Sequence, residues 1–277
     1  MTPYETLLHF IRERESIRQK KEAGLPLPWT DYPILAQYRF CNVRREDDKE
    51  TRWLHQNWLH PNAQDPDVWF AMAAARHVNK HETLAQLGYP VPWDPERFVE
   101  LIRGIRAQKG KAYNAAYMIR ASKGKEWGDK AEYLAKAVLG KLWENREQIR
   151  PVLGDTLMSF NQRLIAQFGL AGFMSGQIVA DVKHIHPLRE AADWWDFAVS
   201  GPGSRRGLNR ILGRETKASW KEPEWHAELL RLRDRVCWDM PTFAIDAQNC
   251  QSLCCEIDKY LRTVNGEGRP KQKYVPA

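Results

Sequence analysis

Apolar residues recur at helical spacing along most of this 277-residue chain, and convincing alternation with a period of two is nearly absent. Asp67–Lys80 is rich in alanine, with a carboxylate at its start and a lysine at its end, as the helix dipole favours. Asp94 and Pro95 have the pattern of an N-cap followed by a first-turn proline, and that helix should end at Lys109 and Gly110. The sequence therefore predicts an all-α fold, with further helices over residues 129–148, 155–168, 173–184, 204–212, 223–236 and 247–264.

Clusters of glycine and proline interrupt the helical pattern at residues 24–28, 88–92 and 201–203. No internal repeat is visible, and no obvious linker divides the chain. We therefore expect a single helical domain over residues 1–277. Residues 1–30 should form an N-terminal helix with a proline-rich lead-in, and residues 265–277 a basic C-terminal tail.

The charge is basic, and its placement indicates a polyanionic partner. The 42 Lys and Arg residues exceed the 35 Asp and Glu residues by seven. Residues 101–125 contain no acid, and Tyr113 and Tyr117 are interleaved with their basic side chains. Neutralised phosphates and stacked bases are what hold an opened or distorted nucleic-acid strand. We expect this window to bind DNA through its basic residues Arg103, Arg106, Lys109, Lys111, Arg120, Lys123 and Lys125.

Cysteine usage and hydropathy favour a cytoplasmic protein. The five cysteines are an odd number and fit a disulfide scaffold poorly. No signal peptide is recognisable, and the longest apolar run, Trp69–Ala75, is too short to cross a membrane. The spacing of Cys250, Cys254 and Cys255 is a weak zinc pattern, because no second Cys/His pair is tied to it, and small buried thiols are the better interpretation.

Several common enzyme classes lose support because their motifs are missing. The sequence contains no GxxxxGK[ST], GxGxxG, HExxH or GxSxG pattern. P-loop kinases, dinucleotide-dependent oxidoreductases, zinc proteases of the HExxH type and α/β-hydrolases are therefore disfavoured.

Four other segments could carry chemistry. In YRFCNVRREDDKETRW (38–53), the four arginines could grip phosphate and an Asn or Asp could position a proton. The alternative is a charged helix laced by i,i+4 pairs such as Arg44 with Asp48. In GLAGFMSGQIVAD (169–181), three glycines before an apolar helix resemble a helix-hairpin-helix that holds a DNA phosphate, or form only a tight helix–helix turn.

The third segment is DWWDFAVSGPGSRRGLNRIL (193–212). Ser204 is a plausible N-cap, and Arg205 with Arg206 would make an anion-binding helix start. Trp194 and Trp195 could stack on a base or belong to the core. In glycosylases built on this hairpin, a catalytic carboxylate follows at about the interval between Gly172 and Asp196.

The fourth segment is DAQNCQSLCCEIDKYLRTVNGEGRPKQKY (246–274). On a helix, one stripe of it would carry both polar and apolar groups, namely Asn249, Leu253, Glu256 and Tyr260.

Six motifs in order resemble the α-glutamyl/putrescinyl thymine pyrophosphorylase family, which is similar to the helical domain of 5-hydroxymethyluracil DNA kinases. They are YRFCNVRREDDKETRW, WFAMAAARHVN, NAAYMIRASKGK, GLAGFMSGQIVADV, GPGSRRGLNR and NCQSLCCEIDKYLR…GEGRPKQKY. The resemblance covers about Asp31 to Tyr274. It implies an all-α helical bundle related to helix-hairpin-helix DNA glycosylases, although the hairpin GLAGFMSG lacks the full glycine pattern.

The resemblance also implies a function. The substrate would be bacteriophage DNA in which 5-hydroxymethyluracil carries phosphate or pyrophosphate, inside the infected host cell. The enzyme would replace that group with an amine, supplied as a free amino acid or polyamine. The site residues that the resemblance carries over are Arg39, Asn42, Arg45, Asp48, Arg76, Asn79, Asn114, Tyr117, Asp181, Gly203, Arg206, Asn209, Asp246, Cys254, Glu256, Lys259 and Tyr260.

As a mechanism, we expect the base to be flipped into an aromatic pocket. Arg45, Arg76 and Arg206 would neutralise the leaving group, and Asp48 or Asp181 would deprotonate the amine. Asn42 and Asn79 complete the expected catalytic set. No cofactor is required, and a divalent metal is allowed but not indicated. Addition of Cys41 or Cys254 to the base is a minor alternative. A glycosylase, a DNA-binding module without catalysis and a protein adaptor are the competing functions.

Overall fold

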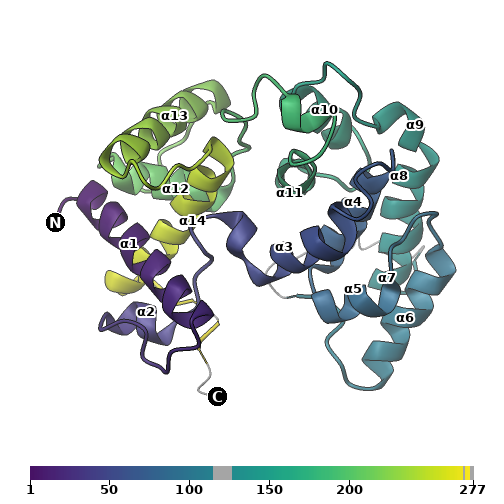
Figure 1. Cartoon of the computed structure of the whole chain (residues 1–277), viewed down its shortest axis with the longest axis horizontal. Helices are drawn as coiled ribbons and strands as arrows, with labels where there is room; N and C mark the ends of the chain where they lie inside the picture. The colour runs from purple at the N-terminus through teal and green to yellow at the C-terminus, as the bar shows by residue number, and fades with distance from the viewer. Residues whose placement is uncertain (115–126, 271, 275–277) are drawn as a thin grey trace. The chain divides into compact units, whose positions relative to one another are not determined.

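The computed structural model describes residues 1–114, 127–270 and 272–274. Within these residues the regular structure is helical, apart from one isolated antiparallel bridge between Tyr38 and Lys273 (Figure 1). The predicted all-α class is therefore confirmed. No described helix is both long and apolar enough to span a membrane.

The chain divides into two compact units. Unit 1 comprises Met1–Asp48 and Trp195–Ala277, and unit 2 comprises Lys49–Trp194. The expectation of a single domain over 1–277 stays a prediction, because compactness alone does not show whether the units fold separately.

Unit 1 contains four long helices and two short elements. The N-terminal helix α1 packs on α12, and α14 packs on α2, α12 and α13. Their bounds are α1 Pro3–Glu22, α2 Pro33–Gln37, the 3₁₀ turn η1 Arg45–Asp47, α12 Pro202–Ile211, α13 Glu222–Asp239 and α14 Ala247–Val264.

Unit 2 is built around α4 and α11, which pack against each other. All of α4 and most of α11 are buried, so the apolar run 69–75 forms a core helix. The elements are α3 Lys49–Leu54, η2 His55–Leu59, α4 Val68–Val78, α5 His81–Leu87, α6 Pro95–Ala107, α7 Lys130–Glu132, η3 Tyr133–Gly140, α8 Lys141–Glu144, α9 Arg146–Ile149, α10 Leu157–Ile165, α11 Gly172–Val182 and η4 Leu188–Glu190.

Side-chain caps explain several helix starts. Thr2 and Glu5 form a reciprocal capping box on α1, and Asp94 accepts the backbone N–H of Arg97 at the start of α6. The predicted N-cap Ser204 is wrong, since Gly201 is the N-cap of α12. The Ser204 hydroxyl lies in the first turn, where it bonds the backbone N–H and carbonyl of Gly201.

One predicted helix is interrupted, and one alternative helix does not form. Residues 38–53 are not the charged helix that was the alternative for this segment, because Arg44 and Asp48 have extended backbone on either side of η1 and cannot pair as i,i+4 neighbours on a helix. Residues 129–148 form α7, η3, α8 and α9 in succession, with π-helical geometry over η3 and a break at Asn145.

The closest helix contact in unit 1 is between α12 and α14. A Cβ atom added to Gly207 would lie 1.9 Å from the Cys254 carbonyl oxygen, which is part of the backbone and cannot move aside cheaply. Gly207 is therefore required for the two backbones to meet at this distance.

We predict that Gly207→Ala destabilises the protein by about 3 kcal/mol or more, because overpacking against backbone forces the helices apart. The matched control is Gly104→Ala in α6, where an added Cβ meets nothing within 4 Å. It should stabilise by about 0.5–1 kcal/mol through helix propensity. Urea unfolding measures both changes, and equal effects of the two substitutions would contradict the packing argument.

Candidate functional site

Arg14 of α1 organises the segment that carries the first sequence motif. Its side chain is buried, and Nη2 donates to the Phe40 carbonyl at 2.9 Å and to Asn42 Oδ1 at 3.3 Å. Nε donates to the Cys41 carbonyl at 3.3 Å. Nη1 reaches the hydroxyl of Tyr274 at 3.0 Å. One guanidinium thus fixes three consecutive residues, and sequence reasoning missed it because Arg14 stands in an ordinary charged helix.

Asp48 lies at the end of this segment and is held by a neighbouring backbone group. Its Oδ1 accepts the Asn42 N–H at 2.9 Å, and the Asn42 amide donates to the Asp47 carbonyl at 2.8 Å. Burial first, and then the negative charge of Glu256, raise the pKa of Asp48 to about 6, against the opposing Asn42 hydrogen bond. Asp48 is therefore a carboxylate that can exchange a proton near neutral pH.

Glu256 of α14 bonds the same segment from the other side. One of its oxygens accepts the Cys41 N–H at 2.9 Å and lies 2.6 Å from Lys259 Nζ. The Lys259 ammonium lies 4.8 Å from the centre of the Phe40 ring. The negative charge of Glu256, and then that of Asp48, raise the pKa of the Cys41 thiol well above its usual value. A thiolate nucleophile at Cys41 is therefore disfavoured.

The predicted stripe on α14 does face the 40–46 segment. Asn249 Oδ1 accepts the backbone N–H of Arg45 at 2.8 Å, and its amide donates to Glu46 at 3.2 Å. Asp246 is the N-cap of α14 and accepts the Asn249 N–H at 2.7 Å. Tyr260 packs on Phe10 and Phe40 with ring centroids 5.4 and 6.1 Å away. Asn249, which the sequence-based site set lacked, thus bonds buried Arg45.

The predicted anion-binding start of α12 is occupied by internal contacts. Arg205 pairs with Glu222 and donates to the Trp220 carbonyl at 3.0 Å. Arg206 pairs with Asp258 at 2.9 Å. The amide of buried Asn209 donates to the carbonyls of Thr216 and Ala218 at 3.1 and 2.9 Å.

Gly203 and Arg39 differ in their surroundings. A Cβ on Gly203 would meet Cys255 Sγ at 3.1 Å, so this glycine lies against α14. Arg39 is exposed, and its backbone N–H bonds the Gln272 carbonyl at 3.1 Å. Of these two residues, only Arg39 presents a side chain to solvent.

Unit 2 holds a buried ion pair between α4 and α11. Arg76 is 2% exposed and Asp181 0%. Arg76 Nε donates to Asp181 Oδ2 at 2.6 Å and Nη2 donates to Oδ1 at 2.5 Å, which makes the contact bidentate. The remaining donors reach Asn79 Oδ1 at 3.1 Å and Thr51 Oγ1 at 3.0 Å. Asn79 has φ +49° and ends α4, which places its side chain back toward Arg76.

One imidazole contacts this ion pair, and two more lie next to that imidazole. His55 Nε2 lies 3.2 Å from Asp181 Oδ1, and the His55 ring is 5.6 Å from that of His60 and 5.4 Å from that of His184. Burial, followed by these two neighbours, lowers the pKa of His60. The sequence motifs contain Asp181 and Arg76, but none of these three histidines.

The acid-free basic window is described only in part. Lys109 and Lys111 are exposed, and the Asn114 N–H bonds the Val78 carbonyl at the end of α4 at 3.1 Å. The Lys111 carbonyl accepts from Lys80 at 2.5 Å. Other predicted DNA-binding residues lie outside the described residues, namely Tyr117, Arg120, Lys123 and Lys125.

The α10–α11 hairpin has the geometry of a tight turn. Gly169 has φ +79°, and an added Cβ would lie 2.7 Å from Val138 Cγ2. Leu170 and Met174 are buried around it. Packing against Val138 and the positive φ explain why residue 169 is a glycine. A phosphate-binding role for this hairpin stays a prediction.

The carboxylates next to the tryptophan pair have structural partners. Asp193 accepts the N–H groups of Leu157 and Met158 at 2.7 and 2.9 Å, which stabilises the start of α10. Asp196 pairs with Arg233 at 2.5 Å. The Trp194 indole donates to the Lys183 carbonyl at 2.8 Å.

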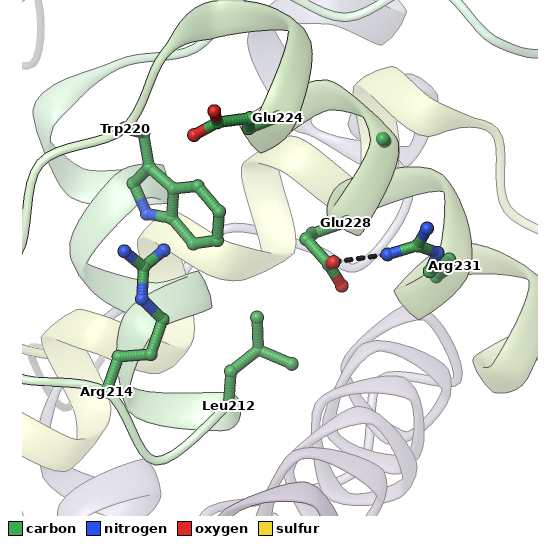
Figure 2. A pocket seen from close by; sticks show the side chains of 7 residues that line it. Leu212, Arg214, Trp220, Glu224, Glu228 and Arg231 are labelled. Atoms are coloured by element: carbon green, nitrogen blue, oxygen red, sulfur yellow. Dashed lines mark hydrogen bonds and ion pairs between the residues drawn. The ribbon is translucent and has the colours of Figure 1, made fainter.

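The pocket in Figure 2 does not contain the predicted site residues. It has a volume of about 540 Å³ in unit 1, with the Arg214 guanidinium 3.6 Å from the centre of the Trp220 ring and an ion pair between Glu228 and Arg231. Its lining residues are Leu212, Arg214, Trp220, Glu224, Ala227, Glu228 and Arg231. The expected aromatic base pocket therefore stays a prediction.

Fold and site together define an all-helical protein with buried arginine–carboxylate contacts and, in unit 1, a carboxylate that titrates near neutrality. The chain belongs to the family described as the 5-hmdU DNA kinase, helical domain, whose model matches residues 2–269. The expected relation to the helical domain of these kinases is thereby confirmed. Relations to thymine pyrophosphorylases and to helix-hairpin-helix glycosylases stay predictions.

Two further comparisons returned no relatives. No curated protein matches the chain, and no solved structure matches it.

We predict that Arg76→Met destabilises the protein by about 3–5 kcal/mol, because Asp181 would keep a buried charge without its bidentate partner. The control is Arg103→Met in the same unit, whose side chain is 51% exposed and pairs with Asp129 and Glu132. Its loss should change the free energy of unfolding little, because water screens exposed ion pairs. Urea unfolding distinguishes the two, and a small effect of Arg76→Met would show that the pair contributes little to folding.

Asp48 leads to a pH-dependent prediction. Its folded pKa of about 6 lies above the ordinary value of 3.8, so the folded state binds the proton more tightly and stability falls as pH rises from about 4 to about 6. Asp48→Asn removes this cost and should stabilise the protein by about 1–3 kcal/mol at pH 7, with almost no effect at pH 4.

The control for this measurement is Asp234→Asn on α13, whose side chain is 66% exposed. It should change stability little at either pH. An Asp48→Asn variant that is equally stable relative to wild type at both pH values would contradict the raised pKa.

Proposed function

We propose that the protein modifies bases in bacteriophage DNA, by replacing phosphate or pyrophosphate on 5-(phospho- or pyrophospho-oxymethyl)uracil with an amine. Membership of the 5-hmdU DNA kinase helical-domain family supports a substrate of DNA with modified thymine. The amine would be a free amino acid or a polyamine, and the reaction would take place in the cytoplasm of the infected bacterium.

The observation that carries this proposal is the state of Asp48. A base that deprotonates an ammonium group needs an accessible lone pair and a pKa near the working pH. Asp48 accepts one backbone hydrogen bond from Asn42 and has a pKa of about 6. Asp181 is fully buried, and both of its oxygens accept from Arg76. Of the two carboxylates that the sequence offered, Asp48 is therefore the better base.

The proposed step balances without a cofactor. Asp48 takes a proton from the incoming ammonium, and the freed nitrogen lone pair attacks the exocyclic methylene carbon of the base. The bond between that carbon and the phosphate oxygen breaks, and its electron pair leaves with phosphate or pyrophosphate. Asp48 then releases its proton to water. The products are a 5-aminomethyl uracil derivative in DNA and the free anion.

The positive charge of an arginine would stabilise the leaving anion, and the three candidate arginines differ in their contacts. Arg45 lies close enough to Asp48 to lower its pKa, which supports a role beside the base. Arg206 is one-third exposed although paired with Asp258. Each nitrogen of the Arg76 guanidinium already donates to Asp181, Asn79 or Thr51, which favours a structural role. Exposed Lys109, Lys111 and Arg39 would bind DNA phosphates.

A second function, binding of modified DNA without catalysis, is favoured by one specific observation. The matching family is described as the helical domain of a kinase, which is a part of an enzyme and does not by itself require chemistry. Several residues expected to bind substrate also hold the fold together, among them Arg205, Asn209 and Asp246.

The test is nucleoside mass spectrometry on DNA carrying 5-(pyrophosphoryloxymethyl)uracil, incubated with the full chain and a pool of amino acids and polyamines. We expect a thymidine adduct that has gained one amine and lost pyrophosphate. Asp48→Asn should slow its formation by about 10²–10⁴-fold, the usual contribution of a general base. Asp234→Asn should leave the rate unchanged.

The other outcomes decide between the alternatives. Unchanged nucleosides with tight binding of the modified DNA would establish the binding module. Abasic sites would show a glycosylase. Amine transfer at wild-type rate by Asp48→Asn would reject Asp48 as the base while keeping the transferase.

A further inference from the structure

A cluster in unit 2 that the proposed function does not use has the chemistry of a cation site. Glu50 belongs to α3, and His81 and Glu82 are the first residues of α5, which packs on α3. One ligand atom from each of the three lies within 4.8 Å of the others. Glu50 Oε1 is 3.0 Å from His81 Nδ1, and Glu82 Oε1 is 3.3 Å from His81 Nε2.

The imidazole is therefore flanked by an anion at each ring nitrogen. A neutral imidazole has one N–H, so it can donate to only one of the two carboxylates. Its other nitrogen then places a lone pair beside a negative oxygen 3.3 Å away, which is unfavourable. One more positive charge between the two atoms, such as a metal ion or a second proton on the ring, would favour the arrangement.

The two sides of the ring are not equivalent. Both Glu50 oxygens are engaged, since Oε2 accepts the His81 backbone N–H at 2.7 Å while Oε1 faces Nδ1. Glu50 is 26% exposed at its side chain and Glu82 is 53% exposed. Nδ1–H donating to Glu50 leaves Nε2 free to face Glu82 and solvent. Metal-binding histidines usually donate their second ring N–H to a carboxylate in this way.

We propose that His81 Nε2 and the Glu82 carboxylate bind a divalent transition-metal ion, with Glu50 as the carboxylate that orients the imidazole. Zinc fits best among such ions. With Zn–N and Zn–O bonds of about 2.0–2.2 Å, two ligands at tetrahedral angles lie about 3.3–3.5 Å apart. The observed separation of Nε2 and the Glu82 oxygen is 3.3 Å. The remaining positions on the ion would hold water or another oxygen ligand.

This inference is independent of the proposed amine transfer, because none of the three residues takes part in it. The site differs from the weak cysteine pattern of α14, whose Cys250 and Cys254 are fully buried. Burial and a hydrogen bond with Cys250 keep the pKa of Cys254 high, which opposes metal binding there.

The experiment is titration of the chelator-stripped full chain with zinc chloride, followed by calorimetry. Wild type should bind one equivalent that His81→Ala abolishes and Glu82→Gln weakens strongly. Glu50→Gln should weaken binding about 10–100-fold, because a Gln carbonyl can still accept the backbone N–H but not orient the ring as a carboxylate does. The control His186→Ala removes an exposed imidazole that pairs with Glu190 at 3.7 Å, and should bind as wild type.

Titration with Co²⁺ identifies the ligand type. A spectrum without thiolate charge-transfer absorption, lost in His81→Ala, would support nitrogen and oxygen ligands. Zinc binding that survives His81→Ala, or no binding together with a doubly protonated His81 ring by NMR at pH 7, would overturn the proposal. The second result would mean that a proton supplies the missing charge. Circular dichroism establishes that each variant is folded.

Discussion

The contact on which unit 2 depends is the bidentate ion pair of Arg76 with Asp181. It joins α4 and α11, the two most buried helices of that unit, at a point where neither charge reaches water. Two charges can remain there because each nitrogen of the guanidinium donates to an acceptor, including Thr51 of α3 and Asn79 at the end of α4. The same pair fixes where His55 lies, since its ring bonds Asp181.

Unit 1 uses a single buried cation for a different purpose. Arg14 donates hydrogen bonds to the carbonyls of Phe40 and Cys41 and to the side chain of Asn42. It thereby holds an extended segment whose carbonyl groups are not paired in a β-sheet. Asn249 and Glu256 of α14 bond the backbone of the same region. Asp48 is thereby kept in a place where burial, rather than an ion pair, sets its pKa. A buried carboxylate with a raised pKa lowers the free energy of unfolding at neutral pH. Such a loss of stability is common at functional sites.

Much of the fold could be predicted from the sequence, because apolar spacing and capping residues act locally. Residues 247–264 were expected to be helical and α14 has these bounds, and Asp94 caps α6 as predicted. Interruptions such as η1 and Asn145 were missed, since they depend on contacts made by distant residues. Tertiary contacts override local propensity in these places.

The candidate site was less accessible to sequence reasoning. Asp48, Asn42, Glu256 and Asp181 were identified through motifs, but the sequence could not show which carboxylate was neutralised by an arginine. Arg14 and the Glu50–His81–Glu82 group could not be recognised from the sequence, because the residues that contact each other are distant along the chain. The neighbouring residues His81 and Glu82 indicate a metal site only when the fold places Glu50 of α3 beside α5.

The near-contact of Gly207 with the Cys254 carbonyl has a mechanical consequence for unit 1. Because not even a Cβ atom fits between the two backbones at this point, α12 and α14 cannot slide past each other there without a clash. A shift of α14 at Asn249 or Glu256 should therefore displace α12 as well. The segment beside Asp48 and the loop that begins α12 would therefore respond to the same event, although their sequences are separated by some 150 residues.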